Sequence, residues 1–270
     1  MQQRSLKAAI LIVGHSQTEE WTLCADYFRR MADDSLLKTA DVLAYVNCTS
    51  IRAAQVEAYL ERFPQQKKFL LYTPMNGHSV ADLPLDVQAN VYKADYDVNR
   101  QGYLFGILEA YANTFDLLKQ YDYVVQINPD VYVTNDRLER YLLENAGNDV
   151  VHHVNTMRGD VENGFSCDFT VYRPRLAREN HFALYRHPDV LDFVLGKAQT
   201  EPNYRFVPEQ ILRHLVLKSG LKYQVICPST RNNRRIDAYG IWHCHDNAAA
   251  RQYLQKGPGL LPNLWPFSKA

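Results

Sequence analysis

The sequence predicts an α/β fold in which a mostly parallel β-sheet is flanked by helices. A continuous apolar run, Ala8–Val13, is typical of a strand that is buried on both faces. Strand-like and helix-like segments alternate through the first half of the chain, which is the rhythm of β-α-β units. Polar residues follow directly after several predicted strands, at the edge where open α/β sheets bind ligands.

Elements of the first half follow from hydrophobic periodicity. Trp21, Cys24, Ala25 and Phe28 recur at helical spacing, so they predict an amphipathic helix after the first strand. A long apolar stripe before Tyr121 predicts the clearest helix of the chain. The predicted strands cover residues 8–13, 42–46, 69–72, 90–93 and 123–127, and the predicted helices are centred on residues 21–28, 53–63 and 104–118.

The second half is less regular. A helix is predicted to begin at Pro208-Glu209-Gln210 and to end at Gly220, because proline favours the first helical turn and glycine the position after the last. The tail 257–267, rich in proline and aromatic residues, is predicted to pack as an extended segment. The predicted strands of this half lie within residues 150–155, 166–174, 223–228 and 239–246.

Composition excludes some classes of function. The 270 residues include 30 basic and 30 acidic side chains, so no bulk charge favours a nucleic-acid partner. No apolar run is long enough for a transmembrane segment. Five cysteines, an odd number without a C-x-x-C pattern, indicate reduced thiols. We therefore expect a cytoplasmic protein, and peripheral association with a membrane stays open.

The segment Asn128-Pro129-Asp130 interrupts an apolar stretch. It separates the strand 123–127 from Val-Tyr-Val, and Pro129 cannot donate a hydrogen bond to a neighbouring strand. One interpretation is a simple turn, because all three residues favour turns. The other is a cation site, since a carboxylate at the end of a buried strand is well placed to bind Mg²⁺ or Mn²⁺.

A histidine pair lies in the late segment YGIWHCHD. Strand alternation places His243 and His245 on one face and Trp242 and Cys244 on the other. A structural zinc site would need Cys244, which points away from both histidines and has no second cysteine nearby in the sequence. Histidines are often merely structural or exposed, so the pair by itself does not establish a metal site.

The segment DVNRQGYLFGILEAYANTF, followed by YDYVVQINPDVYV, resembles the core of GT-A glycosyltransferases. In that family a hydrophobic strand ends in a D-x-D motif that binds the metal at the donor diphosphate. The resemblance implies that Asp130 binds Mn²⁺ or Mg²⁺. Asn128 replaces the first acid, and it would bind the cation, the ribose or a metal-bound water. A late histidine closes the metal site in several such families, which implies His243 first and His245 second.

The resemblance also implies further site residues. Asp168, in SCDFTVYRP, and Glu209, in FVPEQILRHL, are the two carboxylates that could act as the catalytic base. Glu209 has a second interpretation, because an acid in the first turn of a helix simply suits the helix dipole. Asp168 could instead hydrogen-bond to acceptor hydroxyls. Residues implied to bind the nucleotide sugar, besides Asn128, are His15, Ser16, Gln17, Asp97 and Arg100.

The resemblance implies one GT-A (Rossmann-like) domain over residues 1–270. Its nucleotide-sugar-binding half would be 1–135, and its smaller, irregular acceptor-side half 136–270. The expected activity is metal-dependent transfer of a hexose from a nucleotide-diphosphate donor, with a UDP-sugar favoured, to a hydroxyl of a glycan or another acceptor. The chain also looks like small glycosyltransferase domains of large DNA viruses and of bacterial surface-polysaccharide clusters, which implies polysaccharide biosynthesis.

Two other functions stay open. One is a carbohydrate- or nucleotide-binding protein whose GT-A site is degenerate and does not catalyse. The other is a sugar-nucleotide pyrophosphorylase, which would need a glycine-rich loop with basic residues after the first strand. The segment VGHSQTEEW has one glycine and no basic residue, so it disfavours the pyrophosphorylase.

Overall fold

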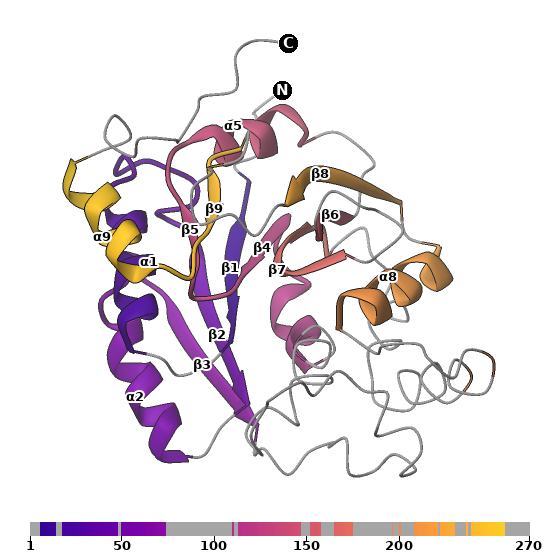
Figure 1. The fold of residues 1–270 in the computed structure, drawn as a ribbon, viewed down its shortest axis with the longest axis horizontal. Helices are drawn as coiled ribbons and strands as arrows, with labels where there is room; N and C mark the ends of the chain where they lie inside the picture. The colour runs from indigo at the N-terminus through magenta and orange to yellow at the C-terminus, as the bar shows by residue number, and fades with distance from the viewer. Residues whose placement is uncertain are drawn as a thin grey trace.

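A seven-stranded sheet organises the described part of the chain (Figure 1). Its strands in spatial order are β3 (Lys68–Thr73), β2 (Asp41–Asn47), β1 (Ala8–Val13), β4 (Tyr123–Ile127), β7 (Phe165–Tyr172), β6 (His152–Met157) and β8 (Tyr223–Ser229). The first four strands are parallel, β7 is antiparallel to both β4 and β6, and β6 and β8 are parallel. The predicted mostly parallel sheet is therefore confirmed.

The computed structural model describes the parts of the chain that form this sheet and most of its helices. The described residues are 6–14, 18–47, 50–73, 110, 113–146, 152–157, 165–174, 196, 200, 208–220, 222–229, 236 and 239–256. The predicted strand 90–93 and the predicted tail 257–267 lie outside them. Within these residues, no helix has the length and hydropathy that a transmembrane span requires.

The helices whose bounds are defined are α1 (Thr18–Arg29), α2 (Ser50–Leu60), α5 (Arg137–Glu144), α8 (Pro208–Ser219) and α9 (Asn247–Lys256). Residues 110 and 113–118, which are the described part of the predicted helix 104–118, are helical as well. In Figure 1, α1, α2 and α9 lie together at the left of the sheet, and α1 contacts both of the others. Helix α8 lies at the right and packs on β7. The C-cap prediction is confirmed, because Gly220 directly follows α8 with φ of 69°.

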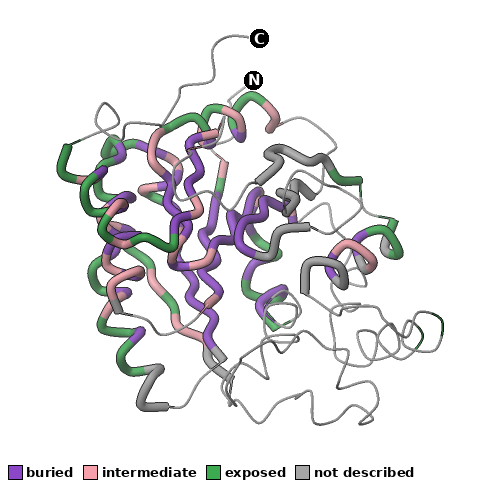
Figure 2. Tube along the Cα trace, viewed as in Figure 1, coloured by how far each residue is buried: buried purple, intermediate pink, exposed green. Residues whose placement is uncertain are grey.

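Burial explains why β1 and β4 are continuous apolar runs. Every residue of both strands is buried, and Figure 2 shows the central strands buried while the outer sides of the helices are exposed. Helix α1 covers this sheet with Trp21, Cys24, Ala25 and Phe28, each fully buried. Burying such side chains contributes about 1.5–3 kcal/mol for each large one. The helical spacing seen in the sequence therefore marks the face of α1 that packs on the core.

A two-stranded ribbon stands apart from the main sheet. It pairs β5 (Val131–Val133) with β9 (Ile241–His243) in antiparallel fashion, and β5 contacts α1. Aromatic rings fill the space around it: Tyr27 of α1 stacks on Tyr132 at 4.7 Å between centroids, and Trp242 meets Tyr132 edge-on at 5.9 Å. The ribbon is thereby fixed between α1 and the C-terminal part of the described chain.

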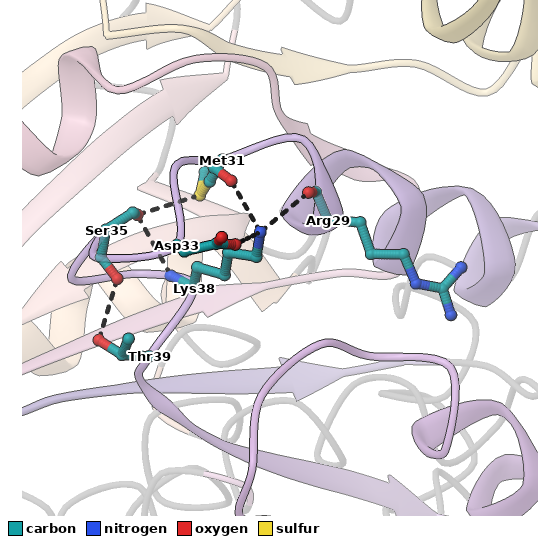
Figure 3. A network of polar contacts seen from close by, with 6 residues as sticks. All are labelled: Arg29, Met31, Asp33, Ser35, Lys38 and Thr39. Atoms are coloured by element: carbon teal, nitrogen blue, oxygen red, sulfur yellow. Dashed lines mark hydrogen bonds and ion pairs between the residues drawn. The ribbon is translucent and has the colours of Figure 1, made fainter.

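The loop between α1 and β2 is closed by polar contacts (Figure 3). Lys38 Nζ donates to the backbone oxygens of Arg29 and Met31, at 3.2 and 2.9 Å, and to Asp33 Oδ1 at 2.7 Å. An ammonium group suits this position because the last carbonyls of a helix carry partial negative charge. Lys38 therefore ends α1 and fixes the path of the chain toward β2.

Some elements differ from the sequence-based expectation. Strand β6 begins two residues later than its prediction and continues to Met157. The predicted strand 239–246 is limited to β9, so His245 lies just beyond it. The sequence did not predict α5 or α9. Only Leu138 and Leu142 of α5, and Ala250 and Tyr253 of α9, are buried, so each helix has too short an apolar stripe to be read from sequence alone.

Candidate metal site at the ends of β1 and β4

The strand order places a ligand-binding edge at the carboxyl ends of β1 and β4. The chain proceeds from β1 to β2 and β3 on one side and then returns to add β4 on the other side of β1. Open α/β sheets bind ligands where the strand order reverses in this way. Gly14 follows β1 there, and a Cβ added to it would lie 2.6 Å from Cδ of Pro129. The two strand ends are therefore in close contact.

Asn128-Pro129-Asp130 is a turn that moves the chain from one sheet to another. The Asn128 N–H still donates to the backbone oxygen of Asp168 on β7, at 2.9 Å. The Val131 N–H then donates back to the Asn128 oxygen at 3.0 Å, which closes a four-residue turn with Pro129 at its second position, where proline is favoured. After this turn the strand resumes as β5 and pairs with β9 instead of the main sheet.

The ribbon brings both histidines to Asp130. The Cys244 N–H donates to the Asp130 backbone oxygen at 3.0 Å, so the neighbours of Cys244 on either side flank the aspartate. His245 Nδ1 lies 2.7 Å from Asp130 Oδ2, and His243 Nε2 lies 3.3 Å from the same oxygen. One ligand atom from each of the three residues lies within 4.8 Å of the others. This arrangement can hold a metal ion.

The Asp130 side chain is mostly buried, so solvent screens the charge of its carboxylate only weakly. The exposed fractions of the side chains are 14% for Asp130, 8% for His243 and 53% for His245, so the cluster opens to solvent on the His245 side. Burial by itself would raise the pKa of Asp130, but the neighbouring imidazoles of His243 and His245 hold it well below its usual range. Asp130 is therefore ionised, as a cation ligand must be.

A second layer of polar groups lies behind the cluster. Asn128 Nδ2 donates to Asp168 Oδ1 at 2.8 Å, and Asp168 Oδ2 lies 3.5 Å from His243 Nδ1. The Asp168 side chain is 6% exposed. Asn128 Oδ1 is buried and accepts no hydrogen bond from the described residues. A buried oxygen of this kind usually has a partner, so it fits a site that binds a cation or a ligand group.

Glu20, an acidic residue not selected from the sequence, interacts electrostatically with this cluster. Burial raises the pKa of Glu20, on the first turn of α1, and the negative charge of Asp130 raises it further, while His245 lowers it. Its signal in the sequence is weak, because acids in a first helical turn are common for reasons of the helix dipole alone. The proximity to Asp130 depends on the contact between α1 and β5, which the sequence does not reveal.

The structure therefore brings together five of the residues selected from the sequence, which are Asn128, Asp130, Asp168, His243 and His245. Glu209 is the second residue of α8, and its side chain is not among those described. Cys244 is buried, its thiol contacts the backbone oxygen of Asp246, and burial raises its pKa to about 11. The other selected residues, all outside the described part of the chain, are His15, Ser16, Gln17, Asp97 and Arg100.

Comparisons with known proteins bear on the fold. No protein-family model matches the sequence, and no curated protein matches it. Among solved structures, mouse xyloside xylosyltransferase 1 in its apo form matches with a TM-score of 0.50 at 10% identity, over 90% of this chain and 98% of that chain. The bifunctional glycosyltransferase WbbM in its apo form matches with a TM-score of 0.50 at 11% identity, over 95% of this chain and 50% of that chain.

These similarities confirm the predicted fold class. The chain has a GT-A (Rossmann-like) α/β fold, with a mostly parallel sheet flanked by helices. It spans nearly the whole length of the mouse enzyme and about half of WbbM. At such low identity the likeness shows the fold alone, and a function must be argued from the site.

Proposed function

We propose that this protein is a metal-dependent glycosyltransferase. It would move a sugar from a nucleotide-diphosphate donor to a hydroxyl of a glycan or another acceptor. The observation that carries this proposal is the cluster of Asp130, His243 and His245 at the carboxyl ends of β1 and β4, where this fold binds its ligands. The mouse protein of similar fold is by name a xylosyltransferase, which supports sugar transfer.

Asp130, His243 and His245 would hold the cation. Asn128, two residues before Asp130, carries a further buried oxygen, Oδ1, that accepts no hydrogen bond from the described residues. A bound divalent cation supplies Lewis-acid stabilisation of the departing diphosphate. Between the two cations expected from the sequence, the imidazole nitrogens favour Mn²⁺ over Mg²⁺. We propose His15, Ser16, Gln17, Asp97 and Arg100 as contacts of a nucleotide sugar, with UDP favoured as the nucleotide.

In the transfer, the acceptor oxygen bonds to the anomeric carbon while the bond from that carbon to the diphosphate breaks. The nucleoside diphosphate leaves, and the acceptor proton needs a base. If the reaction inverts the anomeric centre, we propose Glu209 as this base. Asp168 is the weaker candidate, because both of its carboxylate oxygens already face Asn128 and His243 in a buried position.

A donor screen tests the proposal directly. Purified protein with Mn²⁺ and a panel of nucleotide sugars should release a nucleoside diphosphate, and Asp130→Ala should lower the release at least about 100-fold because the cation loses its charged ligand. Asp34→Ala is the matched control, since Asp34 is exposed and distant in sequence from the cluster. Full release by Asp130→Ala would contradict the metal assignment.

Calorimetry and a product assay separate sugar transfer from the two other functions, carbohydrate binding and pyrophosphorylase activity. A glycosyltransferase should bind the nucleoside diphosphate much more tightly with Mn²⁺ than with EDTA. Binding of a glycan without any effect of the nucleotide would instead indicate a lectin-like protein. Formation of pyrophosphate from a nucleoside triphosphate and a sugar phosphate would indicate the pyrophosphorylase.

A further inference from the structure

We propose that Asp168 is a positioning residue that, together with Asn128, orients the imidazole of His243 toward the cation site. The inference rests on the proposed metal site and adds a role that differs from that of a catalytic base. It explains two features at once: a buried aspartate behind the cluster, and an asparagine at the start of Asn-Pro-Asp.

His243 lies between two carboxylates. Its Nε2 is 3.3 Å from Asp130 Oδ2, and its Nδ1 is 3.5 Å from Asp168 Oδ2. Only the nitrogen that faces Asp130 can join that carboxylate in binding one cation. A metal-binding histidine donates its other N–H to an acceptor, which fixes both the tautomer and the direction of the ring. Asp168 stands where that acceptor is needed.

Asn128 in turn holds Asp168. Its Nδ2 donates to Asp168 Oδ1 at 2.8 Å, and its backbone N–H donates to the Asp168 backbone oxygen at 2.9 Å. The carboxylate therefore has Oδ1 fixed by β4, while Oδ2 faces His243. An aspartate at position 128 would place a second carboxylate against Asp168 Oδ1 and replace a hydrogen bond with repulsion. Asn128 is thus the hydrogen-bond donor that Asp168 requires.

Burial makes this orientation effective. The side chains of Asp168 and His243 are 6% and 8% exposed, so bulk water has little access to replace either partner. A buried hydrogen-bonding group without its partner is costly, and the ring can instead rotate to find another. Removal of the carboxylate should therefore leave the ring and its tautomer less well defined, even when the fold is intact.

The test measures the ring itself as well as metal binding. The probes are the ring ¹⁵N shifts of selectively labelled histidine at pH 8, with the His243 signals identified by a His243→Gln variant. Cd²⁺ serves as a diamagnetic substitute for Mn²⁺. We expect wild-type His243 to carry its proton on Nδ1 with Cd²⁺ bound. Asp168→Asn should mix the two tautomers and weaken Mn²⁺ binding, measured by electron paramagnetic resonance, by about 10- to 100-fold.

Two further variants keep the test decisive. Asn128→Ala leaves the Asp168 charge but removes its donor, so it should also mix the two His243 tautomers, to a smaller extent. This tautomer readout replaces that of Asp168→Asn if that variant does not fold; Mn²⁺ affinity alone does not, because Asn128 is itself a candidate cation ligand. Thr170→Ser, a conservative change at a buried position of the same strand, is the control and should leave the His243 signals unchanged.

The outcomes separate this inference from the proposed function. If the wild-type protein binds no Mn²⁺, the metal site itself is wrong. If the wild-type protein binds Mn²⁺, but Asp168→Asn and Asn128→Ala keep its affinity and its tautomer, the metal site stands and the positioning role is refuted. A His243 ring protonated on Nε2 in the Cd²⁺-bound protein would refute it as well.

Discussion

Gly14 is the residue at which the carboxyl ends of β1 and β4 come closest. Its missing side chain leaves room for the ring of Pro129, and that ring fixes the turn between Asn128 and Asp130. Glycine is needed here for close approach of two strands. Because Gly14 has no Cβ, the two strand ends can approach, and this approach places Asp130, the proposed metal ligand.

Gly14→Ala should lower the free energy of unfolding by about 1–3 kcal/mol, because the new methyl group overlaps the Pro129 ring and one strand end must move. Urea unfolding measures this change. The same variant should also bind Mn²⁺ more weakly, since Asp130 follows Pro129 directly. Gly196→Ala is the control: Gly196 is an exposed helical residue with no atom within 4 Å of an added Cβ, and its stability should stay the same or rise.

At the scale of elements, α5 is tied to the loop after α1 by one side chain. Glu139 of α5 accepts a hydrogen bond from Ser35 Oγ at 2.7 Å and another from the Leu36 N–H at 2.9 Å. The loop is the one that Lys38 closes against α1 (Figure 3). Glu139 thus joins elements that lie far apart in the sequence, and together with the buried Leu138 and Leu142 it holds this short helix in place.

Glu139→Gln should lower the free energy of unfolding by about 1–3 kcal/mol, because the amide keeps one acceptor but loses the charge that strengthens both bonds. Chemical unfolding with urea gives the value. Glu144→Gln on the same helix is the matched control, as Glu144 is exposed, and it should change stability by less than about 0.5 kcal/mol. Equal effects of the two substitutions would contradict the role given to Glu139.

The ribbon of β5 and β9 depends on Gly240. Its φ is 78°, its oxygen accepts hydrogen bonds from the N–H and the hydroxyl of Thr134, and the side chain of Asn135 lies against its Cα. A side chain here would be strained by the backbone and would also meet Asn135. Because β9 carries His243, a change of backbone conformation at Gly240 should displace this residue of the proposed metal site.

Gly240→Ala should therefore destabilise the protein more than Gly220→Ala. Gly220 has a similar φ of 69° but no atom within 4 Å of an added Cβ, so alanine there costs only about 1–2 kcal/mol of left-handed strain. The difference between the two unfolding free energies isolates the overlap with Asn135. Gly240→Ala should also weaken Mn²⁺ binding, whereas Gly220→Ala should not. Equal stability of the two variants would show that Asn135 moves aside freely.

At the scale of the whole molecule, Asp130 makes stability depend on pH. Its pKa in the folded protein is held well below the value of about 3.9 in an unfolded chain. A depressed pKa adds stability that is present above the unfolded value and is lost as the pH falls toward the folded value. Protonation of Asp130 at low pH should therefore lower the free energy of unfolding of the protein.

Wild-type protein in EDTA should therefore be more stable than Asp130→Asn at pH 6, and the difference should shrink as the pH falls below about 4. Urea midpoints at a series of pH values measure it. Asp34→Asn is the control, because this exposed side chain should give the same curve as the wild type. A difference between wild type and Asp130→Asn that grows toward low pH would contradict the assigned sign.

Local patterns in the sequence were sufficient for most elements of the core. The side chain at each position of a strand or helix points in a fixed direction, so buried positions form a pattern in the sequence. This pattern is seen in the apolar runs of β1 and β4 and in the spacing of Trp21 to Phe28. The turn at Asn128-Pro129-Asp130 was also readable, since proline cannot continue a ladder. The division into halves at residue 135 stays a prediction.

Only the tertiary structure decided which polar residues meet. The approach of His243 and His245 to Asp130 depends on the pairing of β5 with β9, and the approach of Asp168 to Asn128 depends on the pairing of β4 with β7. Such pairings join distant parts of the chain, and their register is set by packing on both sides. The sequence by itself determined most strands of the main sheet, the turn and the candidate ligands, whereas the fold determined that Asp168 faces His243 from behind.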